Sequence, residues 1–402
     1  MSYTSKDLIE LENKYSANNY HPLDVVINRG EGVWVYDVEG NKYMDFLSGY
    51  SALNQGHVNE KILEAAQEQI QKLTLTSRAF RNDQFGLFCQ EICELTNYDK
   101  VLPMNSGAEA VETALKMARK WGYQKKGISE GKAEIIACAG NFHGRTISIV
   151  TFSTEDQYRD GFGPFTDGFK VVEYGSAKAI EDAITENTAA VLVEPIQGEA
   201  GIIMPKEGYL TEVAKICKEN NVLLMLDEIQ TGLGRTGKLF AYEHEKDAKP
   251  DVLILGKALS GGFYPVSAVL ANEDVMEVFK PGDHGSTFGG NPLAAAIARA
   301  ALRVLTEDNL VQNAEENGNY LMERLRTIDS KLIKEIRGKG LFIGIELTEG
   351  SGGARPFCEA LQKEGVLCKE THENVLRLAP PLVITREELD FAFEKLKKIL
   401  EA

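Results

Sequence analysis

The sequence predicts an α/β protein of two domains: a large domain with a mostly parallel sheet flanked by helices, and a smaller α+β domain. With 402 residues, the chain is longer than one hydrophobic core usually serves. Between about residues 58 and 290, helical patterns alternate with short apolar runs, which is typical of a parallel sheet. No Pro/Ser-rich linker divides the chain, so we expect both ends (1–49 and 291–402) to form the small domain around a large domain at 50–290.

The first predicted strands are antiparallel and are followed by the alternating helices and strands of the large domain. Residues 25–46 alternate apolar and polar side chains, with a turn expected at Glu39, Gly40 and Asn41. In the large domain, we expect helices to open near Asn59, Asp83, Ser106 and Ser176, and strands to centre on Val101, Ile135, Val171, Leu192, Leu224, Leu253 and Ala268.

The C-terminal part of the sequence has a less regular pattern. It predicts two long amphipathic helices, then a strand pair around 341–347 and short strands near Val366 and Val375. A capping-box sequence at 385–388 opens a last helix. Such a mixture is typical of an α+β domain.

Charge and composition limit the possible partners. A net charge of −16 repels polyanions, which argues against nucleic acid or an acidic membrane and leaves a small-molecule substrate. The six cysteines are scattered and the histidines lack zinc-site spacing, so no metal is expected. No apolar stretch is long enough to span a bilayer and no leader-like segment is present, so we expect a cytoplasmic protein.

Three apolar runs each end in an ionisable residue: Glu194, Asp227 and Lys257. Ligands of an open α/β sheet bind outside the carboxyl ends of its strands, so these side chains are expected to converge on one crevice. Taken alone, Lys257 could be an exposed strand-end lysine and Asp227 a turn cap. Together, a lysine that can attack an aldehyde and a carboxylate that can keep a pyridine nitrogen protonated indicate pyridoxal phosphate.

A phosphate could bind where the helix near Ser106 begins. A strand ends just before it, and Gly107 and Ala108 would present the free N–H groups of a helix N-terminus. Ser286 and Thr287 could add hydroxyl donors to the same phosphate. An ordinary capped helix start and an ordinary polar turn remain the alternatives.

Other strand-end segments could recognise a ring and a carboxylate. Phe142 could stack on a planar ring, while Arg145 or Arg377 could hold a carboxylate through two parallel hydrogen bonds. A core phenylalanine and surface ion pairs are the alternatives.

One glycine motif points to another cofactor. Gly232, Gly234 and Gly237 match the dinucleotide fingerprint G-x-G-x-x-G. Residues 227–230 separate this motif from its strand, and no clear crossover helix follows. A nicotinamide or flavin site is therefore disfavoured.

Seven short segments form a highly specific combination that extends over nearly the whole chain. They are Tyr-Met-Asp-Phe-Leu-Ser-Gly-Tyr (43–50), Asn-Gln-Gly-His (54–57), Asn-Ser-Gly-Ala-Glu-Ala (105–110), Phe-His-Gly-Arg-Thr (142–146), Glu-Pro-Ile-Gln-Gly-Glu (194–199), Asp-Glu-Ile-Gln-Thr-Gly (227–232) and Gly-Lys-Ala-Leu-Ser-Gly-Gly (256–262). Together they resemble the class III aminotransferases, which have the type I fold of pyridoxal-phosphate (PLP) dependent transferases. Within this family the chain most resembles the ornithine aminotransferases.

The resemblance implies roles in binding the cofactor. Lys257 would form the Schiff base and carry the proton, Asp227 would pair with the pyridine nitrogen, and Gln230 would contact the ring hydroxyl. Phe142 would stack on the ring, and Thr287 would reach the phosphate from the other subunit of a homodimer. The other cofactor-binding candidates are Ser106, Gly107, Ala108, Glu194 and Ser286.

The resemblance also implies two substrates, L-ornithine and 2-oxoglutarate, with glutamate as a product of a ping-pong transamination. Arg145, helped by Tyr20, would hold the α-carboxylate of ornithine far from the reacting δ-amine. Arg377 would clamp the α-carboxylate of glutamate, and Glu199 would pair with Arg377 while ornithine is bound.

Two tyrosines favour ornithine over its N-acetyl form. Acetylornithine aminotransferases usually lack a tyrosine at the position of Tyr50 and the sequence pattern around Tyr20, both present here. His143 departs from the animal ornithine enzymes, which tend to carry tryptophan there. The remaining alternatives are an acetylornithine or 4-aminobutyrate aminotransferase, an aminomutase of the same fold, and a non-catalytic PLP-binding regulator. The negative charge argues against a regulator that binds DNA.

Overall fold

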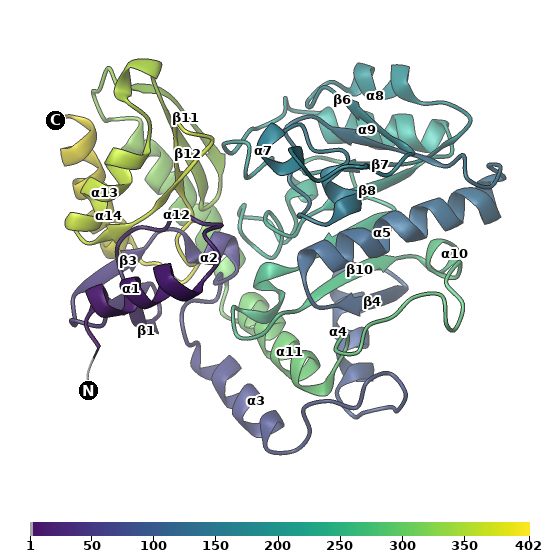
Figure 1. Cartoon of the computed structure of the whole chain (residues 1–402), viewed down its shortest axis with the longest axis horizontal. Coiled ribbons are helices and arrows are strands. Elements are labelled where there is room, and N and C mark those ends of the chain that lie inside the picture. The colour runs from purple at the N-terminus through teal and green to yellow at the C-terminus, as the bar shows by residue number, and fades with distance from the viewer. Residues whose placement is uncertain (1–2) are drawn as a thin grey trace.

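The protein has three sheets arranged in two units that lie side by side (Figure 1). The structure, a computed structural model, describes residues 3–402. A seven-stranded sheet forms the larger unit, and two four-stranded sheets form the smaller one. Every helix of residues 3–402 is too short or too polar to cross a membrane.

The seven-stranded sheet confirms the predicted mostly parallel sheet. Its strands follow the order β4-β10-β9-β8-β7-β5-β6, and only β10 runs antiparallel to its two neighbours. Each strand contains one of the seven predicted centres. The strands are β4 (Lys100–Met104), β5 (Glu134–Cys138), β6 (Phe169–Val172), β7 (Thr188–Val193), β8 (Leu223–Asp227), β9 (Val252–Leu255) and β10 (Ser267–Ala271).

Helices cover both faces of this sheet because successive residues of each strand point to opposite faces and both sets are apolar. On one face, Ile135, Leu192 and Met225 pack with residues of α5. On the other face, the alternate residues pack in the larger core with α8 and α9. The larger helices around this sheet are α3 (Glu60–Ile70), α4 (Phe85–Thr96), α5 (Gly107–Trp121), α8 (Ala177–Ala183) and α9 (Tyr209–Glu219).

Side-chain caps fix where several helices begin, as the sequence predicts. Asn59 caps α3, Ser106 caps α5 and Ser176 caps α8, each by accepting a backbone N–H. The helix expected near Asp83 begins two residues later. Short elements complete this unit: η1 (Gly122–Lys126), α6 (Ile147–Val150), α7 (Asp156–Arg159), η2 (Ala241–His244), η3 (Lys257–Ser260) and α10 (Glu273–Met276).

The two smaller sheets bring both chain ends together. In one, the antiparallel strands β1 (Ile27–Glu31), β2 (Trp34–Asp37) and β3 (Lys42–Asp45) are extended by the late strand β13 (Val366–Leu367), which pairs parallel with β3. The predicted turn at Glu39, Gly40 and Asn41 joins β2 to β3. The other sheet contains β11 (Ile333–Lys339), β12 (Phe342–Leu347), β14 (Lys369–Thr371) and β15 (Val375–Leu378).

Four long helices follow the large sheet or cover the small ones. α12 (Leu310–Leu325) packs on α14 (Arg386–Leu400), which opens with the predicted capping box. α13 (Arg355–Lys363) packs on β13, with η4 (Glu349–Ser351) before it. α11 (Pro292–Glu307) packs against α3 and α4 (Figure 1). We propose the predicted division into two domains, with α11 counted in the larger one.

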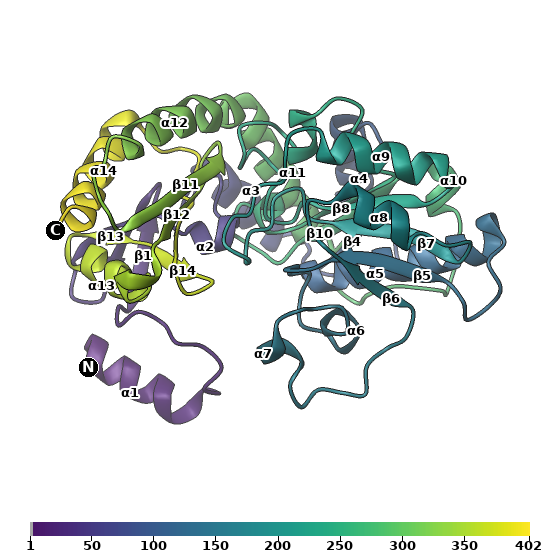
Figure 2. The same ribbon diagram turned by 90° about the horizontal axis from the view of Figure 1, so that it is seen from above.

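Two further helices lie early in the chain. α1 (Ser5–Tyr15) has no buried residue and lies apart from both units in Figure 2. Its first residue donates two hydrogen bonds to Glu39, of 2.7 Å from the backbone and 2.5 Å from the hydroxyl. α2 (Ser48–Ser51) lies between the units and has positive φ values at Gly49 and Tyr50.

The glycine motif of residues 232–237 forms a junction between the units. Arg235 is fully buried and donates to the carbonyls of Leu341 (2.9 Å) and Pro380 (2.6 Å) and to Asn54 Oδ1 (2.5 Å). A short 3-10 helix follows instead of a crossover helix. The motif is thus a structural joint, in line with the sequence argument against a dinucleotide site.

Candidate functional site

The structure brings three ionisable residues together at one edge of the large sheet. β7, β8 and β9 are neighbours and parallel, and Glu194, Asp227 and Lys257 lie at their carboxyl ends. All three line one cavity of about 210 Å³. The other lining residues are Gly107, Ala108, Phe142, His143, Gly144, Ile196, Glu199, Ile229, Gln230 and Thr231.

Lys257 combines an unusual backbone conformation with a lowered pKa. It is half-buried and begins η3, with a positive backbone φ of 44° that a lysine rarely adopts. Burial lowers the pKa of Lys257 to about 8, although the negative charge of Glu199 opposes this. A substantial fraction of this amine is therefore neutral near pH 8.

Asp227 is held by a buried histidine. Its Oδ2 lies 2.7 Å from Nδ1 of His143, and its Oδ1 accepts the backbone N–H of Ile229 at 3.0 Å. Burial alone would lower the pKa of His143, but the hydrogen bond and charge of Asp227 outweigh it and raise the pKa. His143 was not among the site residues predicted from the sequence. Its signals were its place directly after Phe142 in a strand-end loop and its departure from the tryptophan of the animal ornithine enzymes.

Glu194 holds the loop that carries Phe142. Its Oε1 accepts the backbone N–H of Phe142 at 2.8 Å. Burial raises the pKa of Glu194 to about 7, although the neighbouring His143 opposes the shift. Glu194 therefore contributes to the position of the candidate stacking ring.

The candidate phosphate site combines the start of α5 with a serine loop. Ser106 and Glu109 cap the helix reciprocally, and this capping box leaves the N–H groups of Gly107 and Ala108 unused. Both residues line the cavity. Ser286 Oγ accepts from Asn105 Nδ2 at 2.8 Å, which brings this serine beside the helix start. Thr287 is exposed and lies outside the lining of this cavity.

Glu199 and Arg377 form a two-pronged ion pair at the edge of the cavity. The distances are 2.7 Å from Nη1 to Oε1 and 2.9 Å from Nη2 to Oε2. Burial by itself would raise the pKa of Glu199, but the charge and hydrogen bonds of Arg377 lower it to about 2. The guanidinium of Arg377 also lies 5.1 Å from the centre of the Tyr50 ring.

Gln230 supports this pair from the cavity side. Its Nε2 donates to Glu199 Oε1 at 3.1 Å, while its buried Oε1 has no hydrogen-bond partner in residues 3–402. A Cβ atom at position 198 would lie 1.6 Å from that Oε1, so only glycine leaves room for Gln230 here.

A second, larger cavity of about 860 Å³, here called the mouth, adjoins the first, and Phe142 and Glu199 line both. Tyr158 lines this mouth as well. The guanidinium of Arg145 lies 4.0 Å from the centre of the Tyr158 ring, and the Arg145 side chain is exposed. Arg145 itself lies outside the lining of both cavities, beside a ring of the mouth, whereas Arg377 pairs with Glu199, which lines both.

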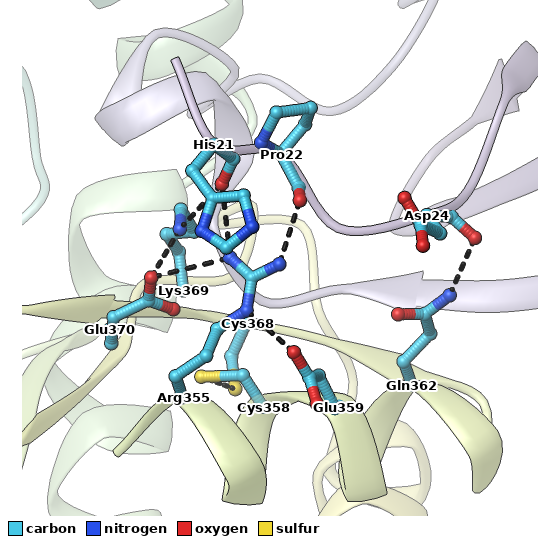
Figure 3. A network of polar contacts seen from close by, with 10 residues as sticks. All are labelled: His21, Pro22, Asp24, Arg355, Cys358, Glu359, Gln362, Cys368, Lys369 and Glu370. Atoms are coloured by element: carbon cyan, nitrogen blue, oxygen red, sulfur yellow. Dashed lines mark hydrogen bonds and ion pairs between the residues drawn. The ribbon is translucent and has the colours of Figure 1, made fainter. Parts of the chain in front are cut away.

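Tyr20 is exposed and lies outside the lining of both cavities. The segment that follows it is tied to the smaller unit (Figure 3). Arg355 donates to the carbonyls of His21 (3.0 Å) and Pro22 (2.7 Å), and Lys369 Nζ also donates to His21 at 3.3 Å. Glu370, which lines the mouth, accepts from Arg355 at 3.4 Å. This network links Tyr20 to the rim of the mouth.

The cavity suits a small aromatic cofactor with a phosphate. Two buried polar atoms in its lining residues, His143 Nε2 and Gln230 Oε1, have no partner among the described residues. A Cβ atom at Gly107 would lie 3.1 Å from the Ile229 side chain, so any larger residue would crowd the helix start where a ligand could bind. An acid, a lysine and a helix N-terminus in one cavity are the donor set expected for PLP.

Comparison with known proteins agrees with this geometry. A family model described as "Aminotransferase class-III" matches residues 15–400. An ornithine aminotransferase of Exiguobacterium is 61% identical over 394 residues, 98% of this chain and 97% of that protein. The structure of an ornithine aminotransferase from Toxoplasma gondii matches 99% of this chain and 94% of its own, with a TM-score of 0.97 and 46% identity. An acetylornithine aminotransferase from Elizabethkingia anophelis matches 99% of both chains, with a TM-score of 0.91 and 51% identity.

Proposed function

The chain belongs to the class III aminotransferases, and from that premise we propose that it transfers the δ-amino group of L-ornithine to 2-oxoglutarate. The products are glutamate and glutamate 5-semialdehyde, which cyclises to pyrroline-5-carboxylate. Relatives named ornithine aminotransferase are 57 and 61% identical over nearly the full chain. The observation that carries this choice is the Glu199–Arg377 pair, because it masks one carboxylate clamp while Arg145 stays free.

The enzyme uses PLP, held in the 210 Å³ cavity. When bound, PLP supplies an aldehyde for the incoming amine and a ring that stabilises negative charge on the carbon that loses a proton. We assign the phosphate to Ser106, Gly107 and Ala108, the ring faces to Phe142, and the ring hydroxyl to Gln230. Asp227 would keep the ring nitrogen protonated, and His143 would keep Asp227 charged.

Lys257 is the proton carrier in this proposal. It lines the cavity together with Asp227 and Glu194, and its lowered pKa of about 8 lets it both accept and return a proton near neutral pH. The burial that lowers this pKa also limits the access of water to the reacting carbon.

Arg145 and Arg377 would distinguish the two substrates by their position. Ornithine presents its distal amine, so its α-carboxylate would lie at the outer end of the site, at Arg145. During this step Glu199 keeps Arg377 occupied. Glutamate presents its α-amine, so its α-carboxylate would lie next to the reacting carbon, at Arg377. Glu199 would then release Arg377.

We propose that the active site is shared between two subunits of a homodimer. Thr287 is exposed and lies outside its own cavity, although Ser286 next to it touches the helix start. Several large side chains ahead of β1 are exposed as well, including Leu11, Tyr15 and Tyr20. Burial of such side chains against a second copy would be favourable.

A second candidate substrate is N-acetylornithine, because the acetylornithine aminotransferase of E. anophelis is 51% identical to this chain. The test is to give the purified, PLP-loaded protein 2-oxoglutarate with either L-ornithine or N-acetylornithine. Formation of pyrroline-5-carboxylate and glutamate from free ornithine supports the proposal. A much higher kcat/KM with N-acetylornithine would leave the family intact and overturn the substrate. In both cases, turnover should disappear in Lys257→Ala.

A further inference from the structure

Arg145 is held by aromatic rings. Its guanidinium carbon lies 4.0 Å from the centre of the Tyr158 ring and 5.6 Å from that of Phe142. Among the described residues 3–402, no carboxylate forms an ion pair with it. A guanidinium that stacks on a ring uses its flat face, so the N–H groups in its plane stay free for a carboxylate.

Tyr158 is itself fixed at the mouth. It lies on the short helix α7, whose last residue Arg159 donates to the Ser153 carbonyl at 3.0 Å. The Tyr158 ring meets Phe142 edge to face, with centres 5.9 Å apart and planes at 76°. Phe142 is held in turn by Glu194. A continuous line of contacts thus runs from the strand end at Glu194 to Arg145.

The burial of Tyr158 and the charge of Arg145 agree with a contact between these two residues at the mouth. Tyr158 is half-buried, and burial raises its pKa while the charge of Arg145 opposes the shift. The same ring lines the mouth together with Glu199. A substrate that reaches Lys257 through this mouth therefore passes the Tyr158 ring.

We propose that Tyr158 is a positioning residue that holds Arg145 beside the mouth and so selects substrates with a carboxylate remote from the reacting amine. The inference rests on the proposed function, in which Arg145 binds the α-carboxylate of ornithine. Without the ring, the long arginine side chain would sample many rotamers, and binding would have to order it. The loss should appear in KM and leave kcat unchanged, because the contact is the same before and during the reaction.

The experiment compares Tyr158→Leu with Tyr158→Phe in the PLP-loaded enzyme. Phenylalanine keeps the ring face for Arg145, while leucine keeps an apolar side chain without a ring. Each variant is assayed with L-ornithine and with putrescine, which is ornithine without its carboxylate. KM for glutamate is measured in the half-reaction, and thermal unfolding of each variant checks that it is folded.

We expect Tyr158→Leu to raise KM for ornithine about fivefold, the scale of one cation–π contact, and Tyr158→Phe to leave it within about twofold. KM for putrescine and for glutamate should stay unchanged. An unchanged KM for ornithine in Tyr158→Leu overturns the inference, and so does an equal effect on all three amines. If the wild type prefers N-acetylornithine, the proposed function fails. The change in KM for N-acetylornithine in Tyr158→Leu then decides the role of Tyr158. A wild type without transaminase activity on either amine overturns both.

Discussion

The carboxylate of Glu199 and the guanidinium of Arg377 meet in two parallel hydrogen bonds of 2.7 and 2.9 Å. Arg377 is 1% exposed, so this carboxylate is the partner that balances a buried charge. Gln230 steadies the same carboxylate from the other side. A substrate carboxylate could bind Arg377 only by replacing Glu199. Glu199 therefore competes with the carboxylate of glutamate for Arg377.

Removing the charge of Glu199 should favour glutamate. In Glu199→Gln, Arg377 loses its anionic partner, so we expect kcat/KM for the glutamate half-reaction to rise about tenfold, and that for the δ-amine of ornithine to fall. Rapid-mixing absorbance of each half-reaction measures both. Glu373→Gln is the control, because Glu373 lines the same mouth without contacting Arg377. Equal changes in the two variants would contradict a specific role for the ion pair.

His143 should strengthen cofactor binding through Asp227. In His143→Leu the buried carboxylate loses its 2.7 Å partner, so its charged form becomes costly and PLP should bind about tenfold more weakly. His143→Gln keeps a polar group and should lie between leucine and the wild type. Equilibrium dialysis of cofactor-free protein with PLP gives the dissociation constants. The role would be refuted by wild-type affinity in His143→Leu.

The attachment of PLP should depend on pH through Lys257. Only the neutral amine can attack the aldehyde, and its pKa is lowered to about 8. We expect the rate of covalent attachment to cofactor-free protein to rise from about pH 6, to be half-maximal near pH 8 and to level off above about pH 9, as followed by absorbance after rapid mixing. An unperturbed lysine would give a rise whose midpoint lies at about pH 10.4.

The Arg355 network should fix the segment that carries Tyr20. In Arg355→Ala, the Pro22 carbonyl loses its donor and the His21 carbonyl keeps only Lys369, so we expect faster hydrogen exchange in residues 18–24 and a KM for ornithine about threefold higher. Lys398→Ala, which breaks an exposed ion pair on α14, is the control. Unchanged exchange in Arg355→Ala would show that other contacts hold this segment.

The strands of the large sheet could be predicted because burial on both faces leaves runs such as Leu223–Asp227 without polar interruption. Capped helix starts were equally clear, since Ser106 and Glu109 carry their signal within four residues. The contacts of His143 and Tyr158 could not be predicted. His143 meets Asp227, which lies 84 residues away in the sequence. Tyr158 meets Phe142 and Arg145 of the same irregular segment, whose path single residues do not reveal. The helix α1 was missed because none of its residues is buried.

The pairing of β3 with β13 sets an order of events during synthesis. Met44 of β3 lies opposite Val366 of β13, so the first strands of the chain must wait for about 320 further residues before their sheet can close. At the usual pace of translation this delay is roughly 15 to 65 seconds. All strands of the seven-stranded sheet have left the ribosome well before then, so that sheet can fold first and act as the surface on which the ends later assemble. In the meantime, the edge of β3 that later pairs with β13 stays open to pairing with other strands.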